Sequence, residues 1–136
     1  MEHELLTGRI IGCAMRVHRT LGPGFLESVY QHALAWELRL AKHAADCQRR
    51  LTVRYRGLEV GIFVPDVIVD ERVILEIKAV ERLNAAHEVQ LVNYLTITGI
   101  EVGLLLNFGS SRLEVRRKFR RKDSASAQVR PNNQTG

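Results

Sequence analysis

The chain has 136 residues, of which 46% are hydrophobic and 26% are charged, and this composition predicts one globular domain with its own hydrophobic core. It contains neither a run of about 18 apolar residues nor the basic-then-apolar start of a secretory signal, so we expect a cytoplasmic protein without a membrane span. Cys13 and Cys47 stand apart from each other and from any Cys/His cluster, which argues against a disulfide framework and a structural zinc site.

Hydrophobic periodicity predicts the elements in chain order. Helical spacing occurs on both sides of the Gly/Pro break at residues 22–24, β alternation begins after Asp46, and helical spacing returns before Gly99. The predicted elements are helices over 4–21 and 25–44, strands within 48–56, 58–70 and 72–80, a helix over 85–98, and strands over 101–108 and 112–119. The three consecutive strands should form a meander, and the whole order predicts an α/β sandwich with a mixed sheet.

The C-terminal residues differ in composition from the rest of the chain. Residues 123–136 are polar and show no periodic pattern, so we expect them to form a disordered tail. The sequence therefore predicts a single domain over residues 1–122 followed by this tail.

The net charge of +5 comes from one short segment. Residues 1–111 carry 12 Lys/Arg against 13 Asp/Glu, whereas residues 112–122 carry 7 against 1. Because Lys and Arg neutralise backbone phosphates, a basic block that includes an aromatic residue, Phe119, is typical of an edge that follows nucleic acid. The alternative is a solvated final strand followed by a soluble tail. The candidate nucleic-acid-binding residues are Arg112, Arg116, Arg117, Lys118, Arg120, Arg121 and Lys122.

Three charged residues stand out in the predicted strands. Residues two apart in a strand point to the same face, so Glu76 and Lys78 project together. If residues 70–72 form a turn, symmetric pairing about Glu71 places Asp66 directly opposite Glu76. Directly opposed residues have Cβ atoms about 4.5–5.5 Å apart. The two carboxylates are therefore predicted to be close neighbours.

Neighbouring carboxylates in a strand that is apolar on both sides repel each other, and they need a cation or a proton for compensation. Mg²⁺ or Mn²⁺ would suit the oxygen ligands of Asp66 and Glu76, and a water bound to such an ion can attack a phosphodiester. Lys78 would orient that water or stabilise the developing charge, and the backbone carbonyl of Ile77 would complete the coordination. The alternative is the charged surface of an ordinary amphipathic hairpin.

Several longer segments occur together in a recognisable order. They are GFLESVY, VPDVIVD, VILEIKAVERL, HEVQLVNYL and TGIEVGLLLNFG. Together, from about residue 10 to about residue 115, they resemble the GxxExxY family of the PD-(D/E)xK nuclease superfamily. The family pattern is met by Gly24, Glu27 and Tyr30, and the superfamily pattern by Asp66, Glu76 and Lys78. The resemblance implies a restriction-endonuclease-like αβββαβ core, with an additional N-terminal helix and a nuclease-like site.

The same resemblance gives roles to residues of the predicted helices. It implies that Glu27 is an additional metal ligand or a ligand of a second metal ion, for which the alternative is an exposed acid in a first helical turn. Gln90 resembles a helical residue that assists the superfamily's site, and His87 and Tyr94 share its helix face, where they would line the site or contact phosphate. The alternatives are an exposed histidine and a core tyrosine. Tyr30 is a further candidate, for which a structural role is expected.

Three functions are consistent with these patterns. The first is a metal-dependent nuclease that acts on DNA in preference to RNA. The second is a nucleic-acid-binding domain with a vestigial site, and the third is a protein-interaction module. A domain of this size has little surface for reading a nucleic-acid sequence, so a homodimer or a partner protein is also expected.

Overall fold

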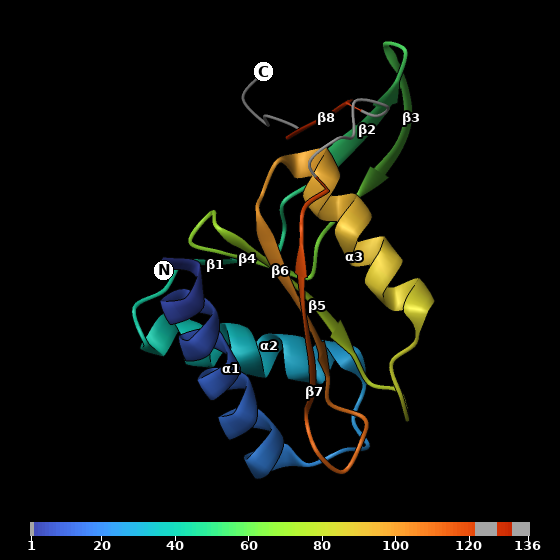
Figure 1. Ribbon diagram of the computed structural model, residues 1–136. Coiled ribbons are helices and arrows are strands. Elements are labelled where there is room, and N and C mark those ends of the chain that lie inside the picture. Colours follow the sequence, from blue (N-terminus) through green and yellow to red (C-terminus); the bar gives the residue numbers. More distant parts are fainter. Residues whose placement is uncertain (1, 122–127, 132–136) are drawn as a thin grey trace.

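The computed structural model describes residues 2–121 and 128–131, which form three helices and eight strands (Figure 1). The helices are α1 (Glu2–Leu21), α2 (Glu27–Leu40) and α3 (Ala85–Thr98). The strands are β1 (Ala45–Asp46), β2 (Leu51–Tyr55), β3 (Leu58–Phe63), β4 (Val67–Val69), β5 (Val73–Lys78), β6 (Val102–Asn107), β7 (Glu114–Phe119) and β8 (Gln128–Pro131). No helix among these residues is long and apolar enough to cross a membrane.

A five-stranded mixed sheet lies at the centre, in the order β1-β4-β5-β6-β7. Strands β5 and β6 are parallel and are connected through α3, whereas the other neighbours are antiparallel. Helices α1 and α2 lie on one side of the sheet and α3 lies on the other (Figure 1). The predicted fold class, an α/β protein with a mixed central sheet flanked by helices, is confirmed.

The strands of this sheet are apolar on both faces because each face packs against helices. Val67 and Leu75 point into the core shared with α1 and α2, and Ile74 points into the core shared with α3. Burying each large aliphatic side chain contributes about 1.5–3 kcal/mol. A charged residue placed within these strands is therefore held inside an apolar layer, as the sequence predicted for Glu76, which is only 7% exposed.

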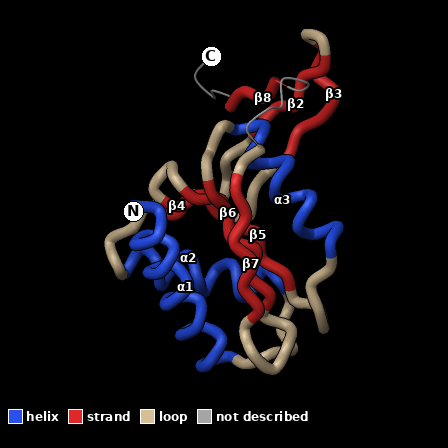
Figure 2. The backbone as a smooth tube through the Cα atoms, in the orientation of Figure 1, coloured by secondary structure: helices blue, strands red, loops and turns tan. Residues whose placement is uncertain are grey.

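The predicted meander of three strands is wrong in one respect. The β-rich run over 58–70 divides at Pro65, which lacks an N–H group for a sheet ladder, and β3 does not continue into β4. Strand β3 pairs instead with β2 in a second sheet, in the order β3-β2-β8. Figure 2 shows these three strands beyond one end of the five-stranded sheet.

The prediction that residues 123–136 are disordered is wrong for strand β8. Within residues 123–136, Gln128–Pro131 pairs with β2 in an antiparallel register. Backbone hydrogen bonds to an open strand edge need no apolar pattern, which is why composition gave no sign of this strand. The remaining residues of the predicted tail lie outside the described residues.

Candidate active site

The antiparallel hairpin of β4 and β5 carries the predicted acidic residues. Val67 pairs with Leu75, Ile68 with Ile74, and Val69 with Val73. One step beyond this ladder, Asp66 lies beside Glu76. The predicted pairing about Glu71 is therefore confirmed.

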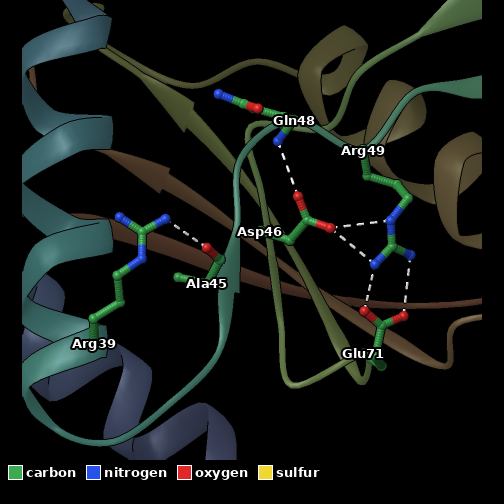
Figure 3. A network of polar contacts seen from close by, with 6 residues as sticks. All are labelled: Arg39, Ala45, Asp46, Gln48, Arg49 and Glu71. Carbon is green, nitrogen blue, oxygen red and sulfur yellow. Dashed lines mark hydrogen bonds and ion pairs between the residues drawn. The ribbon is translucent and has the colours of Figure 1, made fainter. Parts of the chain in front are cut away.

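The turn of this hairpin is fixed by polar contacts to its neighbours. Asp70 and Glu71 have φ values of 51° and 60°, a left-handed conformation that a side-chain anchor can stabilise. Asp70 accepts hydrogen bonds from the Ala44 amide at 2.8 Å and contacts His43 Nδ1 at 2.7 Å. Glu71 is bound by Arg49, which also binds Asp46 of β1 (Figure 3). These contacts hold the register that brings the two acids together.

Each acidic side chain is oriented by a backbone amide of the opposite strand. Glu76 Oε2 accepts a hydrogen bond from the Asp66 amide at 2.9 Å, and Asp66 Oδ2 accepts one from the Ile77 amide at 2.7 Å. No hydrogen bond to Asp66 Oδ1 or Glu76 Oε1 occurs in the part of the chain that the structure describes. The pair is thus preorganised at one end of the hairpin.

Burial and the negative charges of nearby acids make both carboxyl groups hard to ionise. Burial first, and the charge of Asp66 second, raise the pKa of Glu76 to about 8. Burial also raises the pKa of Asp66, and the charge of Glu27 adds to this effect. The ammonium group of Lys78 lowers both pKa values because it favours the ionised forms. A bound cation would act in the same direction as Lys78.

Three further predicted site residues lie on the flanking helices, close to the acidic pair. Glu27, in the first turn of α2, lies close enough to repel both carboxylates. On α3, Tyr94 forms a side-chain hydrogen bond with Gln90, and burial followed by the charge of Glu76 raises the pKa of Tyr94. The Tyr94 ring also stacks on Phe63, with 4.1 Å between ring centroids. The structure thus brings the acidic pair, Lys78, Glu27, Gln90 and Tyr94 together.

Two other candidate residues make contacts of a structural kind. Tyr30 is fully buried, donates a hydrogen bond to the Gly22 carbonyl at 2.5 Å, and stacks on Phe108 at a centroid distance of 4.7 Å. His87 Nδ1 accepts a hydrogen bond from the Asn84 amide, and the Asn84 side chain caps the His87 amide in return. This reciprocal capping box fixes the start of α3.

The basic segment does not form one continuous cationic face. Strand β7 is at the edge of the sheet, as predicted, and its residues alternate between the two faces. Lys118 binds Glu88 on α3 at 2.9 Å, whereas Arg117 donates to Thr7 on α1 at 2.8 Å. The other contacts are Arg116 with Glu114 at 3.6 Å, Arg120 with Glu101 at 2.5 Å, and Arg121 with Asn93 at 3.1 Å. Arg112 is exposed, and Lys122 lies outside the described residues.

Two residues that support the site were not singled out from the sequence. Gln31 donates a hydrogen bond from Nε2 to the Asp66 carbonyl at 2.8 Å, and its position four residues after Glu27 on α2 was the available signal. Asn107 is fully buried at the end of β6, where its side chain binds both the amide and the carbonyl of Val80. The Phe108 amide donates to the Lys78 carbonyl at 2.8 Å. These hydrogen bonds fix the backbone at Asp66 and around Lys78, and so help to position both side chains.

The ligand atoms that the site offers limit which metal ion it would accept. Among the described residues there is no group of three or more His, Cys, Asp or Glu side chains arranged around one metal position. The acidic pair supplies only carboxylate oxygens, and hard cations such as Mg²⁺ are bound through one or two carboxylates with water completing the coordination. The residues present therefore fit a hydrated divalent cation.

The raised pKa of Glu76 leads to a prediction about stability. Between about pH 4.5, its ordinary value, and about pH 8, the folded chain binds more protons at this site than the unfolded chain. The free energy of unfolding should therefore fall as the pH rises through this window. Glu76→Gln keeps the group neutral, so at pH 8.5 in a chelator the variant should be more stable than the wild type by about 2–3 kcal/mol.

Urea unfolding at pH 5 and at pH 8.5 measures this difference. Glu59→Gln is the matched control because Glu59 lies on β3 in an exposed ion pair with Arg54. Its effect on the free energy of unfolding should be small at both pH values. Equal stability of Glu76→Gln and the wild type at pH 8.5 would show that Glu76 ionises normally.

A known protein family matches most of this chain. The profile of the PD-(D/E)XK nuclease superfamily matches residues 4–121. Searches of the curated proteins and of the solved structures gave no significant match. The matched region includes α2, α3 and the β4–β5 hairpin, the elements that surround the acidic pair. The chain therefore belongs to the PD-(D/E)XK nuclease superfamily.

Proposed function

We propose that this protein is a nuclease that hydrolyses phosphodiester bonds with Mg²⁺ or Mn²⁺ and acts on DNA in preference to RNA. The observation that carries the proposal is the buried pair of Asp66 and Glu76, whose raised pKa values reflect a need for positive charge. Membership of the PD-(D/E)XK nuclease superfamily supports the same reaction. The motif of Gly24, Glu27 and Tyr30 supports placement in the GxxExxY group.

Each residue of the site would have its own role in phosphodiester hydrolysis. A bound divalent cation would supply an activated water and positive charge beside the scissile phosphate. Asp66 and Glu76 would hold that cation, together with the Ile77 carbonyl. Glu27 does not lie with them around one metal position among the described residues, so it would act from α2 through water bound to the cation or as a ligand of a second cation. Lys78 would stabilise the negative charge that develops on the phosphate. Gln90 and Tyr94 would orient the substrate from α3.

Substrate contact would extend beyond the acidic pair. We assign the binding of flanking phosphates to Arg112, Arg116, Arg117, Lys118, Arg120, Arg121 and Lys122. Several of these cations already bind carboxylates of the chain, such as Glu88 and Glu101, so a phosphate would have to replace those partners. Such contacts would weaken as the salt concentration rises.

Cleavage assays test this function directly. The purified chain is incubated with duplex DNA, single-stranded DNA and RNA, each with Mg²⁺, with Mn²⁺ and with a chelator. We expect metal-dependent cleavage that the chelator abolishes, and faster cleavage of DNA than of RNA. Salt-sensitive binding without cleavage of any substrate would contradict a nuclease and favour the nucleic-acid-binding domain with a vestigial site.

A further inference from the structure

Helix α2 is apolar on two different faces. Its inner face packs into the core through Tyr30, Leu34, Ala35 and Leu38, which are all buried. A second set of apolar residues runs along its outer side and is called here the outer stripe. The outer stripe consists of Leu26, Val29, Ala33, Trp36 and Leu40. A helix that is apolar on both sides is normally covered on both sides.

Much of the outer stripe is open to solvent. Leu26 is 76% exposed, Trp36 is 61% exposed and Leu40 is 57% exposed. Ala33 lies at the border of the two faces, because it is partly buried and also packs against the core shared with α1. Scattered apolar residues are common on protein surfaces, but a contiguous apolar patch with a central tryptophan is typical of a protein interface. On the same helix, polar Ser28, His32 and Arg39 occupy the neighbouring exposed positions and form one rim of the patch.

The spacing of the outer stripe indicates what kind of partner covers it. Within α2 the residues of the outer stripe are separated by 4, 3 and 4 positions, which is the a/d pattern of a coiled-coil seam, and Leu26 precedes them at the N-cap. A seam of this kind faces another helix along its length, because the residues stay on one side and drift by only about 20° per seven residues. The 14 residues of α2 give a seam about 21 Å long.

The order of side-chain sizes makes the outer stripe complementary to itself. In an antiparallel pair with its two-fold axis between Ala33 and Trp36, Ala33 of each copy lies opposite Trp36 of the other. Val29 of each copy then lies opposite Leu40 of the other. Each layer thus combines a smaller with a larger side chain, so layers of similar volume fill the seam at an interhelical distance of about 8–10 Å.

We propose that two copies of this chain form a dimer by packing their α2 helices antiparallel along the outer stripe. The contact is isologous, with the same surface used by both copies. Each large side chain supplies about 100 Å² of apolar area. The seam and its polar rim then bury less than the roughly 800 Å² per partner of a standard interface, so we expect a weak dimer that dissociates at concentrations on the order of micromolar.

A second exposed apolar surface provides a control. On β3, Leu58, Val60 and Ile62 are also exposed, but they lie on an edge strand of the second sheet rather than on α2. Charged substitutions there should leave an α2-mediated dimer intact. Trp36→Glu on the outer stripe and Ile62→Glu on β3 are therefore a matched pair of variants.

Sedimentation velocity of the full chain, from about 1 to 100 µM, measures the assembly state across the expected dissociation constant. The wild type and Ile62→Glu should shift from the 15.4-kDa monomer to a species of twice that mass, whereas Trp36→Glu should remain a monomer throughout. Circular dichroism confirms that each variant is folded. A monomeric wild type, or a dimer that persists in Trp36→Glu, would overturn the proposal, as would loss of the dimer in Ile62→Glu alone.

Mixing two variants tests the antiparallel register. Ala33→Lys and Trp36→Glu should each be monomeric alone, because each places charge in two layers of its homodimer. Their mixture restores one Ala33–Trp36 layer and opposes Lys with Glu in the other, so a heterodimer should form. If the wild type dimerises but the mixture of the two variants forms no heterodimer, the proposed register with Ala33 opposite Trp36 is wrong. None of these measurements uses metal or nucleic acid, so they remain decisive if the proposed nuclease activity fails.

Discussion

Replacing Asp66 by Asn, or Lys78 by Met, should slow metal-dependent phosphodiester cleavage by about 10³-fold while leaving the fold intact. Asn keeps the size of Asp66 and an oxygen that accepts from the Ile77 amide, but it removes the charge that would hold a cation. Met keeps the length of Lys78 and removes the ammonium group that favours ionisation of both acids. The rate loss should therefore come from the site and not from unfolding.

Binding measurements separate the roles of these two residues. Calorimetric titration of Mn²⁺ should show binding at least about tenfold weaker in Asp66→Asn, because a ligand is lost. Lys78→Met should bind Mn²⁺ nearly as well as the wild type, because Lys78 is not a ligand and its positive charge both favours ionisation of the two acids and repels a cation. Glu59→Gln is the matched control, since Glu59 is an exposed acid on β3 in the second sheet, outside the hairpin that carries the pair. Wild-type cleavage rates in both site variants would refute the assignment of Asp66 and Lys78.

The acidic pair could be located from the sequence because its placement follows from local geometry. The two-residue period of a strand fixes which side chains share a face, and symmetry about Glu71 fixes the register of the hairpin. Helix α3 was predicted with its observed bounds, since Gly99 adopts the left-handed conformation that ends it. These features depend on residues that are close together in the sequence.

The second sheet could not be predicted in the same way. The alternation of β2 and β3 shows that they are strands, but it does not show which sheet they join. Pro65 interrupts the run before Asp66, and this break allows β3 to turn away from β4. The partner of β2 on its other side, β8, lies more than 70 residues later in the chain. Pairing over such a separation depends on tertiary structure that no local pattern encodes.

Long-range contacts also explain the residues that sequence reasoning missed. Gln31 matters only because α2 places its amide against the Asp66 carbonyl, 35 residues away. The basic segment looked like a cationic patch because its acidic partners, such as Glu88 and Glu101, come from other parts of the chain. Charge counted along the chain does not show which charges meet in space.

Gly109→Ala should lower the free energy of unfolding by about 3 kcal/mol, the upper range for forcing extra volume into a packed interior. A Cβ atom at this position would lie 2.4 Å from both the amide nitrogen and the carbonyl oxygen of Val80. Backbone atoms cannot rotate away as a side chain can. Asn107 holds Val80 through two hydrogen bonds, and its Oδ1 also accepts from the Gly109 amide at 3.0 Å. The backbone at Val80 therefore cannot move away from the added methyl group without breaking these hydrogen bonds.

The same substitution links packing to the site, because Val80 lies two residues after Lys78. Any shift of that backbone moves Lys78 relative to the acidic pair, so cleavage should fall together with thermal stability, whose midpoint should drop by roughly 10 °C. Gly12→Ala provides the control: nothing lies within 4 Å of a Cβ atom added at Gly12 in α1, and alanine should stabilise the helix by up to about 1 kcal/mol. Thermal unfolding of both variants compares the two effects. A Gly109→Ala protein as stable as the wild type would mean that the junction of β5 and β6 is packed more loosely than these distances indicate, and that Lys78 is held by the sheet ladder alone.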